Sequence, residues 1–226
     1  MMSGFSEEWN EVYMNNLQLT SWPWSDLVSL LYRNCGDVIQ NKGVVFELGC
    51  GIGPNIPFIQ SIGLTYYGVD GSATVIDKLH RKYPELKERV FKGDFTKKTC
   101  YLELPNVDII IDRASVTHND KTSIVETLNN SYDLLKPGAY YVGIDWFSKK
   151  HSDFVLGEKG ADPNTRKFIL KGQFENVGNV HFSDEAHLRD LFSSFDIISL
   201  EEKIINTYEP KNNHQFSSWN IVGKKK

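Results

Sequence analysis

Short apolar runs alternate with amphipathic segments through the middle of the chain. The apolar runs predict strands at residues 44–47, 64–69, 89–92, 107–111 and 139–147. The segments between them predict helices at residues 55–61, 73–82 and 121–135. Because residues 107–111 are almost uniformly apolar, that strand is expected to be buried on both faces, which is typical of a parallel sheet. The alternation therefore predicts an α/β fold with a doubly wound, mostly parallel sheet and helices on both faces.

The pattern changes at both ends of this core. Residues 5–17 and 24–35 predict two helices of an N-terminal helical cap, separated by a Trp-Pro-Trp step. Residues 148–182 are polar and irregular, and connections of that length are usually functional or disordered. We interpret them as a lid over a substrate. A helix at 184–194 and strands at 195–205 and 215–223 are predicted to complete the chain.

We expect one domain over residues 1–226. Its predicted parts are the cap (1–40), a ligand-binding core (41–147), the insertion (148–182) and a C-terminal helix with strands (183–226).

Composition removes several functional classes. The 226 residues are 40% hydrophobic and 24% charged, as in ordinary globular proteins, and a net charge of -4 gives no basic surface for nucleic acid. The cysteines Cys35, Cys50 and Cys100 are far apart and form no CxxC pair, which indicates free thiols in a reducing compartment. We see no signal-peptide pattern and no apolar run of about 20 residues. The expectation is a cytoplasmic protein without a membrane partner; the oligomeric state is left open.

The first candidate for chemistry is ELGCGIG, residues 47–53, between a predicted strand and a helix. Glycines let a ligand approach the backbone closely, and a helix start supplies free N–H groups. The spacing lacks the third glycine of the dinucleotide fingerprint, G-x-G-x-x-G. Because the carboxylate of Glu47 would repel a phosphate, this turn argues against a nicotinamide-dependent dehydrogenase and favours a ligand with positive charge.

Two further acids end neighbouring strands. Asp70 follows the second strand about 20 residues after the glycine turn, where a carboxylate can accept hydrogen bonds from ribose hydroxyls. Asp94 follows the third strand, although it could also be a capping or loop acid. Since ligands bind at the carboxyl edge of parallel strands, Glu47, Asp70 and Asp94 together predict a ligand with a ribose, a hydrogen-bonding base and no phosphate.

These motifs, in this order, resemble those of S-adenosylmethionine-dependent methyltransferases with the Rossmann-like fold. The resemblance covers about residues 40–147 and rests on ELGCGIG, then GVD at 68–70, GD at 93–94 and LKPG at 135–138. It implies a seven-stranded sheet with an antiparallel last strand, and S-adenosylmethionine as the cofactor.

The resemblance also implies roles for individual residues. Glu47 and the glycine backbone would border the methionine part, Asp70 would hold the ribose, and Asp94 would face the adenine. The implied cofactor residues are Glu47, Gly49, Gly51, Gly53, Asp70, Gly71, Ser72, Gly93, Asp94, Phe95, Asp112 and Arg113. Ser72 is also expected to cap the helix at 73–82.

The acceptor side carries weaker signals. No DPPY or NPPY motif follows the fourth strand, where the sequence is IDRASVTHND; this argues against methylation of adenine, cytosine or glutamine. His118 in this stretch is a candidate general base, and a capping or surface role is about as plausible. The other candidate substrate residues are Trp22, Trp24, Asp145, His151 and His181. No histidine spacing resembles a ligand motif, so no metal is expected.

The sequence thus favours an S-adenosylmethionine-dependent methyltransferase that acts on an oxygen or nitrogen of a small-molecule acceptor. The alternative is a cofactor-binding scaffold subunit of a larger assembly. Turnover of the cofactor by the isolated protein would distinguish the two.

Overall fold

A seven-stranded sheet forms the centre of the computed structural model, which describes residue 20 and residues 22–226. The helix predicted at 5–17 lies outside these residues. The strands are β1 (Val44–Leu48), β2 (Thr65–Asp70), β3 (Val90–Lys92), β4 (Val107–Arg113), β5 (Leu135–Phe147), β9 (Phe195–Asn206) and β10 (Gln215–Lys225). Their order is β3-β2-β1-β4-β5-β10-β9, and β10 is antiparallel to both neighbours. The predicted mostly parallel sheet with an antiparallel last strand is confirmed.

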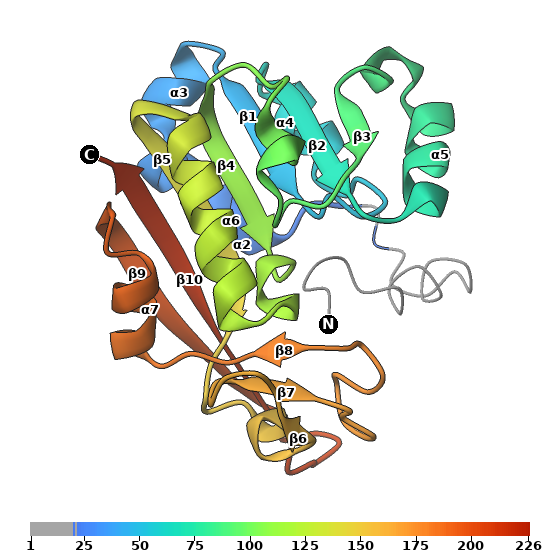
Figure 1. Cartoon of the computed structure of the whole chain (residues 1–226), viewed down its shortest axis with the longest axis vertical. Helices are drawn as coiled ribbons and strands as arrows, with labels where there is room; N and C mark the ends of the chain where they lie inside the picture. Colours follow the sequence, from blue (N-terminus) through green and yellow to red (C-terminus); the bar gives the residue numbers. More distant parts are fainter. Residues whose placement is uncertain (1–19, 21) are drawn as a thin grey trace.

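Helices cover both faces of this sheet (Figure 1). They are α2 (Ser25–Asn34), α3 (Gly36–Gln40), α4 (Ile56–Ser61), α5 (Ala73–Lys82), α6 (Lys121–Leu134) and α7 (Glu185–Leu191). Successive side chains of a strand point to opposite faces, so Ile109 and Ile111 pack with α2 to α5 while Ile110 packs with α6 and α7. The strand predicted to be buried on both faces is therefore β4.

Several short 3-10 turns connect these elements. They are η1 (Pro84–Leu86), η2 (Lys98–Tyr101), η3 (Val116–His118) and η4 (Ser152–Val155). The last two lie beyond the carboxyl ends of β4 and β5, which places them at the edge where the predicted site residues gather.

The LKPG motif belongs to β5, although the sequence predicts that the helix ends at residue 135 and the strand begins only at residue 139. Leu135 already pairs with Val107, so β5 begins four residues earlier than the predicted start at residue 139. The register shifts between Val107 and Ile109, and Gly138 has a φ of 75°, a conformation that glycine adopts without steric cost. The motif thus forms an irregular first part of the strand.

The insertion is more ordered than its sequence indicates. It contains an antiparallel sheet of β6 (Glu158–Lys159), β7 (Thr165–Lys167) and β8 (Val180–His181). A small core of its own is formed by Phe147, Ile169, Phe174, Val180 and Phe182. In Figure 1 this unit lies beyond the carboxyl ends of the parallel strands, and so beside the predicted site.

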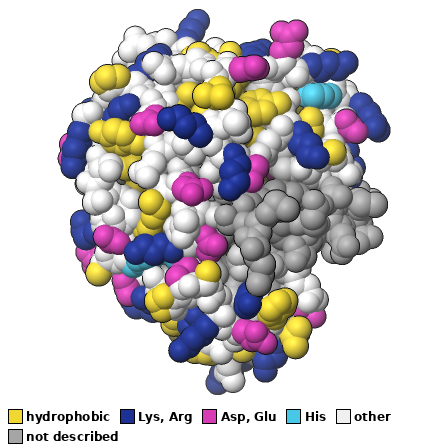
Figure 2. All heavy atoms as spheres, in the orientation of Figure 1, with side chains coloured by type: hydrophobic (Ala, Val, Ile, Leu, Met, Phe, Trp, Pro, Cys, Tyr) yellow, Lys and Arg dark blue, Asp and Glu magenta, His cyan; other side chains and the backbone are white. Residues whose placement is uncertain are grey.

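Basic and acidic side chains are interspersed on the face of the molecule that Figure 2 shows. Hydrophobic side chains are scattered among them, as is normal for a protein surface. Within residue 20 and residues 22–226, no helix combines the length and apolar character needed to cross a bilayer.

Candidate functional site

A cavity of about 360 Å³ lies at the carboxyl edge of the parallel strands. One half is formed by the glycine turn after β1 and by the ends of β2, β3 and β4, and the other half includes residues of the insertion. Of the predicted cofactor residues, those that line the cavity are Glu47, Gly49, Gly51, Asp70, Gly71, Gly93, Asp94, Phe95 and Arg113. Three strand ends predicted separately from the sequence therefore meet at one cavity.

The glycine turn has little room for side chains. Gly49, Gly51 and Gly53 all have positive φ. A Cβ at Gly49 would lie 2.4 Å from the Cβ of Ser115, so the chain after β4 packs directly on this turn. A Cβ at Gly53 would meet Ile56 at 2.5 Å. Gly53 does not line the cavity; its lack of a side chain permits the close start of α4.

Glu47 is a buried carboxylate at the end of β1. Its two oxygens accept hydrogen bonds from Asn55 Nδ2 at 2.7 Å and from the Tyr66 hydroxyl. Burial raises the pKa of Glu47 to about 7, and the nearby charges of Asp112 and Asp70 act in the same direction, against the two hydrogen bonds. Glu47 can therefore gain or lose a proton near neutral pH, and a cation in the cavity would favour its ionised form.

Asp70 closes the glycine turn from the neighbouring strand. Its carboxylate accepts hydrogen bonds from the backbone N–H of Gly51 at 3.0 Å and of Ser72 at 2.9 Å. Burial raises its pKa, and the two backbone hydrogen bonds partly oppose this effect. Ser72 caps α5 as predicted, since its hydroxyl accepts the N–H of Val75, and Ser72 itself lies outside the cavity lining.

Asp94 and Phe95 face the cavity at the end of β3. Oδ1 of Asp94 accepts hydrogen bonds from both the backbone N–H and the hydroxyl of Thr96. Asp94 therefore also has the loop role that its sequence position allowed.

Asp112 does not line the cavity, although it was expected beside the cofactor. It is fully buried, and its Oδ1 accepts hydrogen bonds from the N–H and hydroxyl of Ser115 and from the N–H of Val116. Its carboxylate is thus used to hold the turn η3 against the end of β4. The adjacent Arg113 points the other way, because neighbouring side chains on a strand alternate.

Arg113 joins three elements at the mouth of the cavity. Its Nη2 donates to Asp145 Oδ2 at 3.0 Å, and its guanidinium carbon lies 3.6 Å from the centre of the Trp24 ring. Trp24 and Asp145, two of the candidate substrate residues, both line the cavity. Trp22 does not: its side chain is 74% exposed and lies outside the lining.

His118 lines the cavity between two aromatic rings. Its ring meets Phe147 and Phe174 edge to face at 5.6 and 6.2 Å. Burial lowers the pKa of His118 to about 4, so the imidazole is neutral at physiological pH. Because a carbonyl oxygen can only accept, Nδ1 carries the hydrogen that contacts Asn179 O at 3.2 Å, and Nε2 is the basic nitrogen.

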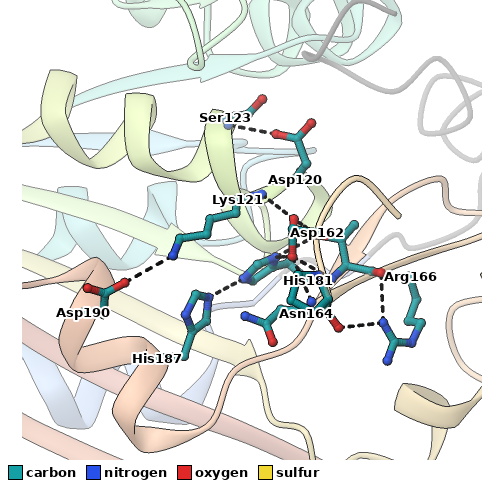
Figure 3. Close-up of polar contacts among 11 residues, drawn as sticks. Asp120, Lys121, Ser123, Asp162, Asn164, Arg166, His181, His187 and Asp190 are labelled. Atoms are coloured by element: carbon teal, nitrogen blue, oxygen red, sulfur yellow. Dashed lines mark hydrogen bonds and ion pairs between the residues drawn. The ribbon is translucent and has the colours of Figure 1, made fainter. Parts of the chain in front are cut away.

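His151 and His181 are buried in the insertion and do not line the cavity. Figure 3 shows His181 between His187 and Asp162. Thr165 donates to Asp162, so His181 Nδ1 donates to Thr165 and His181 Nε2 accepts from His187 Nε2 at 2.9 Å. Burial is the main reason why the pKa of His181 falls to about 4. The ring therefore fixes the insertion against α7 from outside the cavity.

The structure adds residues that were not predicted. These cavity residues include Asn55, Ser115, Asn119, Phe147, Gln173, Phe174, Val177 and Phe216. Asn55 lies two residues after Gly53, immediately before α4, and that position was a usable signal. Within the described residues, Oδ1 of Asn55 and Nε of Arg113 are buried without a hydrogen-bond partner. These two buried atoms belong to residues that line the cavity.

Comparisons with known proteins agree with this geometry. Residues 45–138 match a family model described as "Methyltransferase domain". The match covers 94 of the 226 residues and indicates a methyltransferase domain in this part of the chain. Its cofactor is S-adenosylmethionine, and the protein is an S-adenosylmethionine-dependent methyltransferase. No curated protein sequence matches the chain.

Solved structures of methyltransferases share the fold at low sequence identity. An S-adenosylmethionine-dependent methyltransferase from Anabaena variabilis is 15% identical with a TM-score of 0.67, covering 97% of this chain and 93% of its own. One from Clostridium acetobutylicum is 15% identical with a TM-score of 0.60, covering 95% of each chain. TehB from Haemophilus influenzae is 14% identical with a TM-score of 0.63, covering 96% of this chain and 67% of its own. At these identities the likeness concerns the fold alone.

Proposed function

We propose that this methyltransferase transfers the methyl group of S-adenosylmethionine to an oxygen or nitrogen of a small-molecule acceptor. One observation carries the proposal: the cavity continues from the acidic strand ends into an aromatic half. That half is lined by Phe147, Phe174, Val177 and Phe216, and the insertion supplies two of these residues. Such a wall suits a compact, partly apolar acceptor.

The residues of the acidic half fit the cofactor. The orphaned Oδ1 of Asn55 can accept from an ammonium group and the orphaned Nε of Arg113 can donate to a carboxylate, and the methionine part carries both groups. Glu47 adds a carboxylate beside the ammonium, Asp70 suits the ribose hydroxyls, and Asp94 with Phe95 suits the adenine. The residue roles implied by the resemblance are therefore retained as part of this proposal, with Asn55 added and Asp112 moved to a supporting position.

The chain's own contribution to the reaction is mainly alignment and exclusion of water. The bound cofactor supplies an electrophilic methyl group, so the protein must hold the acceptor atom in line with it. The aromatic half of the cavity and the ring of Trp24, stacked on Arg113, provide the walls for this. A hydroxyl or ammonium acceptor must also lose a proton, and Nε2 of His118 is the basic nitrogen that we assign to accept it.

A pKa near 4 makes His118 a weak base. For His118→Ala we expect a loss in turnover of about 10²-fold, at the low end for general-base catalysis, with cofactor affinity nearly unchanged. His118→Gln can still donate a hydrogen bond to Asn179 but cannot take a proton. Its turnover should therefore fall as much as that of His118→Ala. Full turnover by His118→Gln would remove His118 from proton transfer and leave alignment alone.

The function itself is tested with the isolated protein. It is incubated with S-adenosylmethionine and a fractionated metabolite extract, and mass spectrometry follows a product heavier than its precursor by one methylene unit. We expect such a product together with S-adenosylhomocysteine. Binding of the cofactor without any turnover across the extract would favour the scaffold alternative.

A further inference from the structure

A second cluster of chemically active side chains lies outside the cavity. His151 precedes η4, Asp153 lies within it, and His214 belongs to the connection between β9 and β10. Asp153 has no exposed surface and His151 almost none, whereas the side chain of His214 is 35% exposed. The cluster is thus closed toward the protein and open toward solvent on one side.

The three residues place their ligand atoms close together. One atom from each lies within 4.8 Å of the others. Oδ1 of Asp153 is 3.1 Å from His214 Nε2 and 3.9 Å from His151 Nδ1. Ligand atoms around a tetrahedral Zn²⁺ are about 3.3 Å apart, given bonds of about 2.0–2.1 Å. Small side-chain rotations would therefore bring all three into a shared coordination shell.

The second polar atoms of the buried residues His151 and Asp153 already have hydrogen-bond partners. His151 Nε2 lies 3.3 Å from Gln173 Oε1, and Asp153 Oδ2 accepts the N–H of Phe174. An imidazole that donates its second N–H to an oxygen is the usual arrangement around a metal, because this contact fixes the tautomer and the ring. The ligand atoms that remain are Nδ1 of His151, which accepts the backbone N–H of Asp153, and Oδ1 of Asp153, which contacts His214.

The surroundings of the cluster are aromatic. The ring of His151 lies 4.8 Å from that of Phe174 and 5.5 Å from that of Phe216. Without a metal, Nδ1 of His151 accepts the N–H of Asp153, and His214 donates to Asp153. A bound metal would replace these two hydrogen bonds, and the exposed side of His214 provides its entry.

We propose that His151, Asp153 and His214 bind one Zn²⁺ ion, with solvent in the fourth position. Two imidazoles and one carboxylate form a ligand set that Zn²⁺ accepts and that Mg²⁺, which prefers oxygen ligands, does not. The sequence predicted no metal because His214 lies far from His151 along the chain; the fold brings them together. The ion would tie the insertion to the β9–β10 connection.

The site lies directly behind the acceptor half of the cavity. Gln173, Phe174 and Phe216 contact the cluster and also line the cavity. Bound Zn²⁺ would hold these side chains in place, so the metal acts on the wall that contacts the acceptor and not on the reacting methyl group.

Metal binding is measured directly, without cofactor. Untagged protein is stripped with a chelator, dialysed and titrated with Zn²⁺ against a chromophoric zinc indicator. We expect one equivalent to bind and the midpoint of thermal unfolding to rise. His214→Ala, a change on a half-exposed connection, should weaken binding by about 10-fold or more, since even the loss of an outer-shell partner costs that much.

His187→Ala is the matched control. His187 is another partly exposed histidine in contact with a buried one, but it belongs to the separate pair in Figure 3. This variant should bind Zn²⁺ as the wild type does, and Mg²⁺ should not compete. The proposal is overturned if the wild type binds no Zn²⁺, if His214→Ala binds it unchanged, or if His187→Ala is the variant that loses it. None of these outcomes depends on methyl transfer.

Discussion

Glu47 links the burial of a carboxylate to the charge of the ligand beside it. Its pKa of about 7 arises first from burial and then from Asp112 and Asp70, and the hydrogen bonds from Tyr66 and Asn55 only partly offset this. Near neutral pH, a cavity without a cation therefore leaves Glu47 neutral or half-ionised. When a cationic ligand enters, the ionised form becomes the favoured one, so binding of the ligand releases a proton near neutral pH.

Glu47→Gln should remove one component of the pH dependence of stability. Because the folded pKa lies above the unfolded value of about 4.3, the contribution of Glu47 is fully present at acid pH and is lost as pH rises toward about 7. The free energy of unfolding of the wild type should therefore fall more steeply than that of the variant over this range. Urea unfolding at a series of pH values measures the difference.

The same substitution should change cofactor binding in a related way. Below pH 7, wild-type affinity should rise by up to about tenfold per pH unit, because binding requires the ionised carboxylate. The Gln variant should bind more weakly and without this slope. Calorimetric titration with S-adenosylmethionine from pH 5.5 to 8 measures both affinities. Equal dependence of affinity on pH in the wild type and in Glu47→Gln would contradict this role of Glu47.

Individual site residues were predictable from the sequence where the end of a strand determines their position. Glu47, Asp70 and Asp94 meet because parallel strands bring their carboxyl ends to one edge. Asp112 lies outside the cavity lining, because the direction of its side chain depends on contacts with Ser115 and Val116 that no spacing shows.

Secondary elements were predictable where local signals determine them. Helix α5 has the predicted bounds, with its cap at Ser72 and a regular apolar face. The strands of the insertion were not predicted, because they are two or three residues long and too short to show a period. Their stability comes from contacts distant in sequence, such as the tilted packing of the Phe174 ring against that of Phe147, with ring centres 4.3 Å apart.

Phe174→Ala tests whether the insertion is a packed element that shapes the acceptor half. Phe174 is 4% exposed and lines the cavity, so its removal should cost about 3–5 kcal/mol of stability and weaken acceptor use while cofactor affinity stays unchanged. Leu170→Ala, at a side chain that is 77% exposed, should change stability by about 0.5 kcal/mol or less. Denaturant unfolding and calorimetry measure the two effects, and equal behaviour of both variants would refute the role of Phe174.

For the whole molecule, a chain of four charges connects elements that are far apart in sequence. Asp145 on β5 accepts from Arg113 on β4 and lies 2.6 Å from Lys203 on β9, and Lys203 also pairs with Asp26 on α2 at 2.7 Å. Burial lowers the pKa of Lys203, but its hydrogen bonds to Asp145 and Asp26 outweigh this and raise it overall. Helix α2, which directly follows Trp24, is thereby fixed to the sheet at the mouth of the cavity.

Asp145→Asn tests how much this chain of charges contributes to the free energy of unfolding. Asp145 has a φ of 54°, which asparagine tolerates, so the backbone can be kept while the charge is removed. Arg113 and Lys203 then face each other without their shared partner, and the loss of one member of a buried pair costs about 3–5 kcal/mol. Because both cations are 30% exposed, solvent should reduce the loss to the lower end of that range.

A control variant and a double variant show which interaction causes that loss of stability. Glu201→Gln breaks the exposed pair with Arg33 and should cost about 1 kcal/mol or less. Lys203 keeps its pair with Asp26 when Asp145 is replaced. The double variant Asp145→Asn with Lys203→Met should therefore lose less stability than the sum of the two single losses, since the pair between these residues is lost only once, whereas independent sites would add. Chemical unfolding of the single and double variants measures the coupling. A strictly additive double variant would mean that Asp145 stabilises the fold through its hydrogen bond with Ser218 and not through the charges.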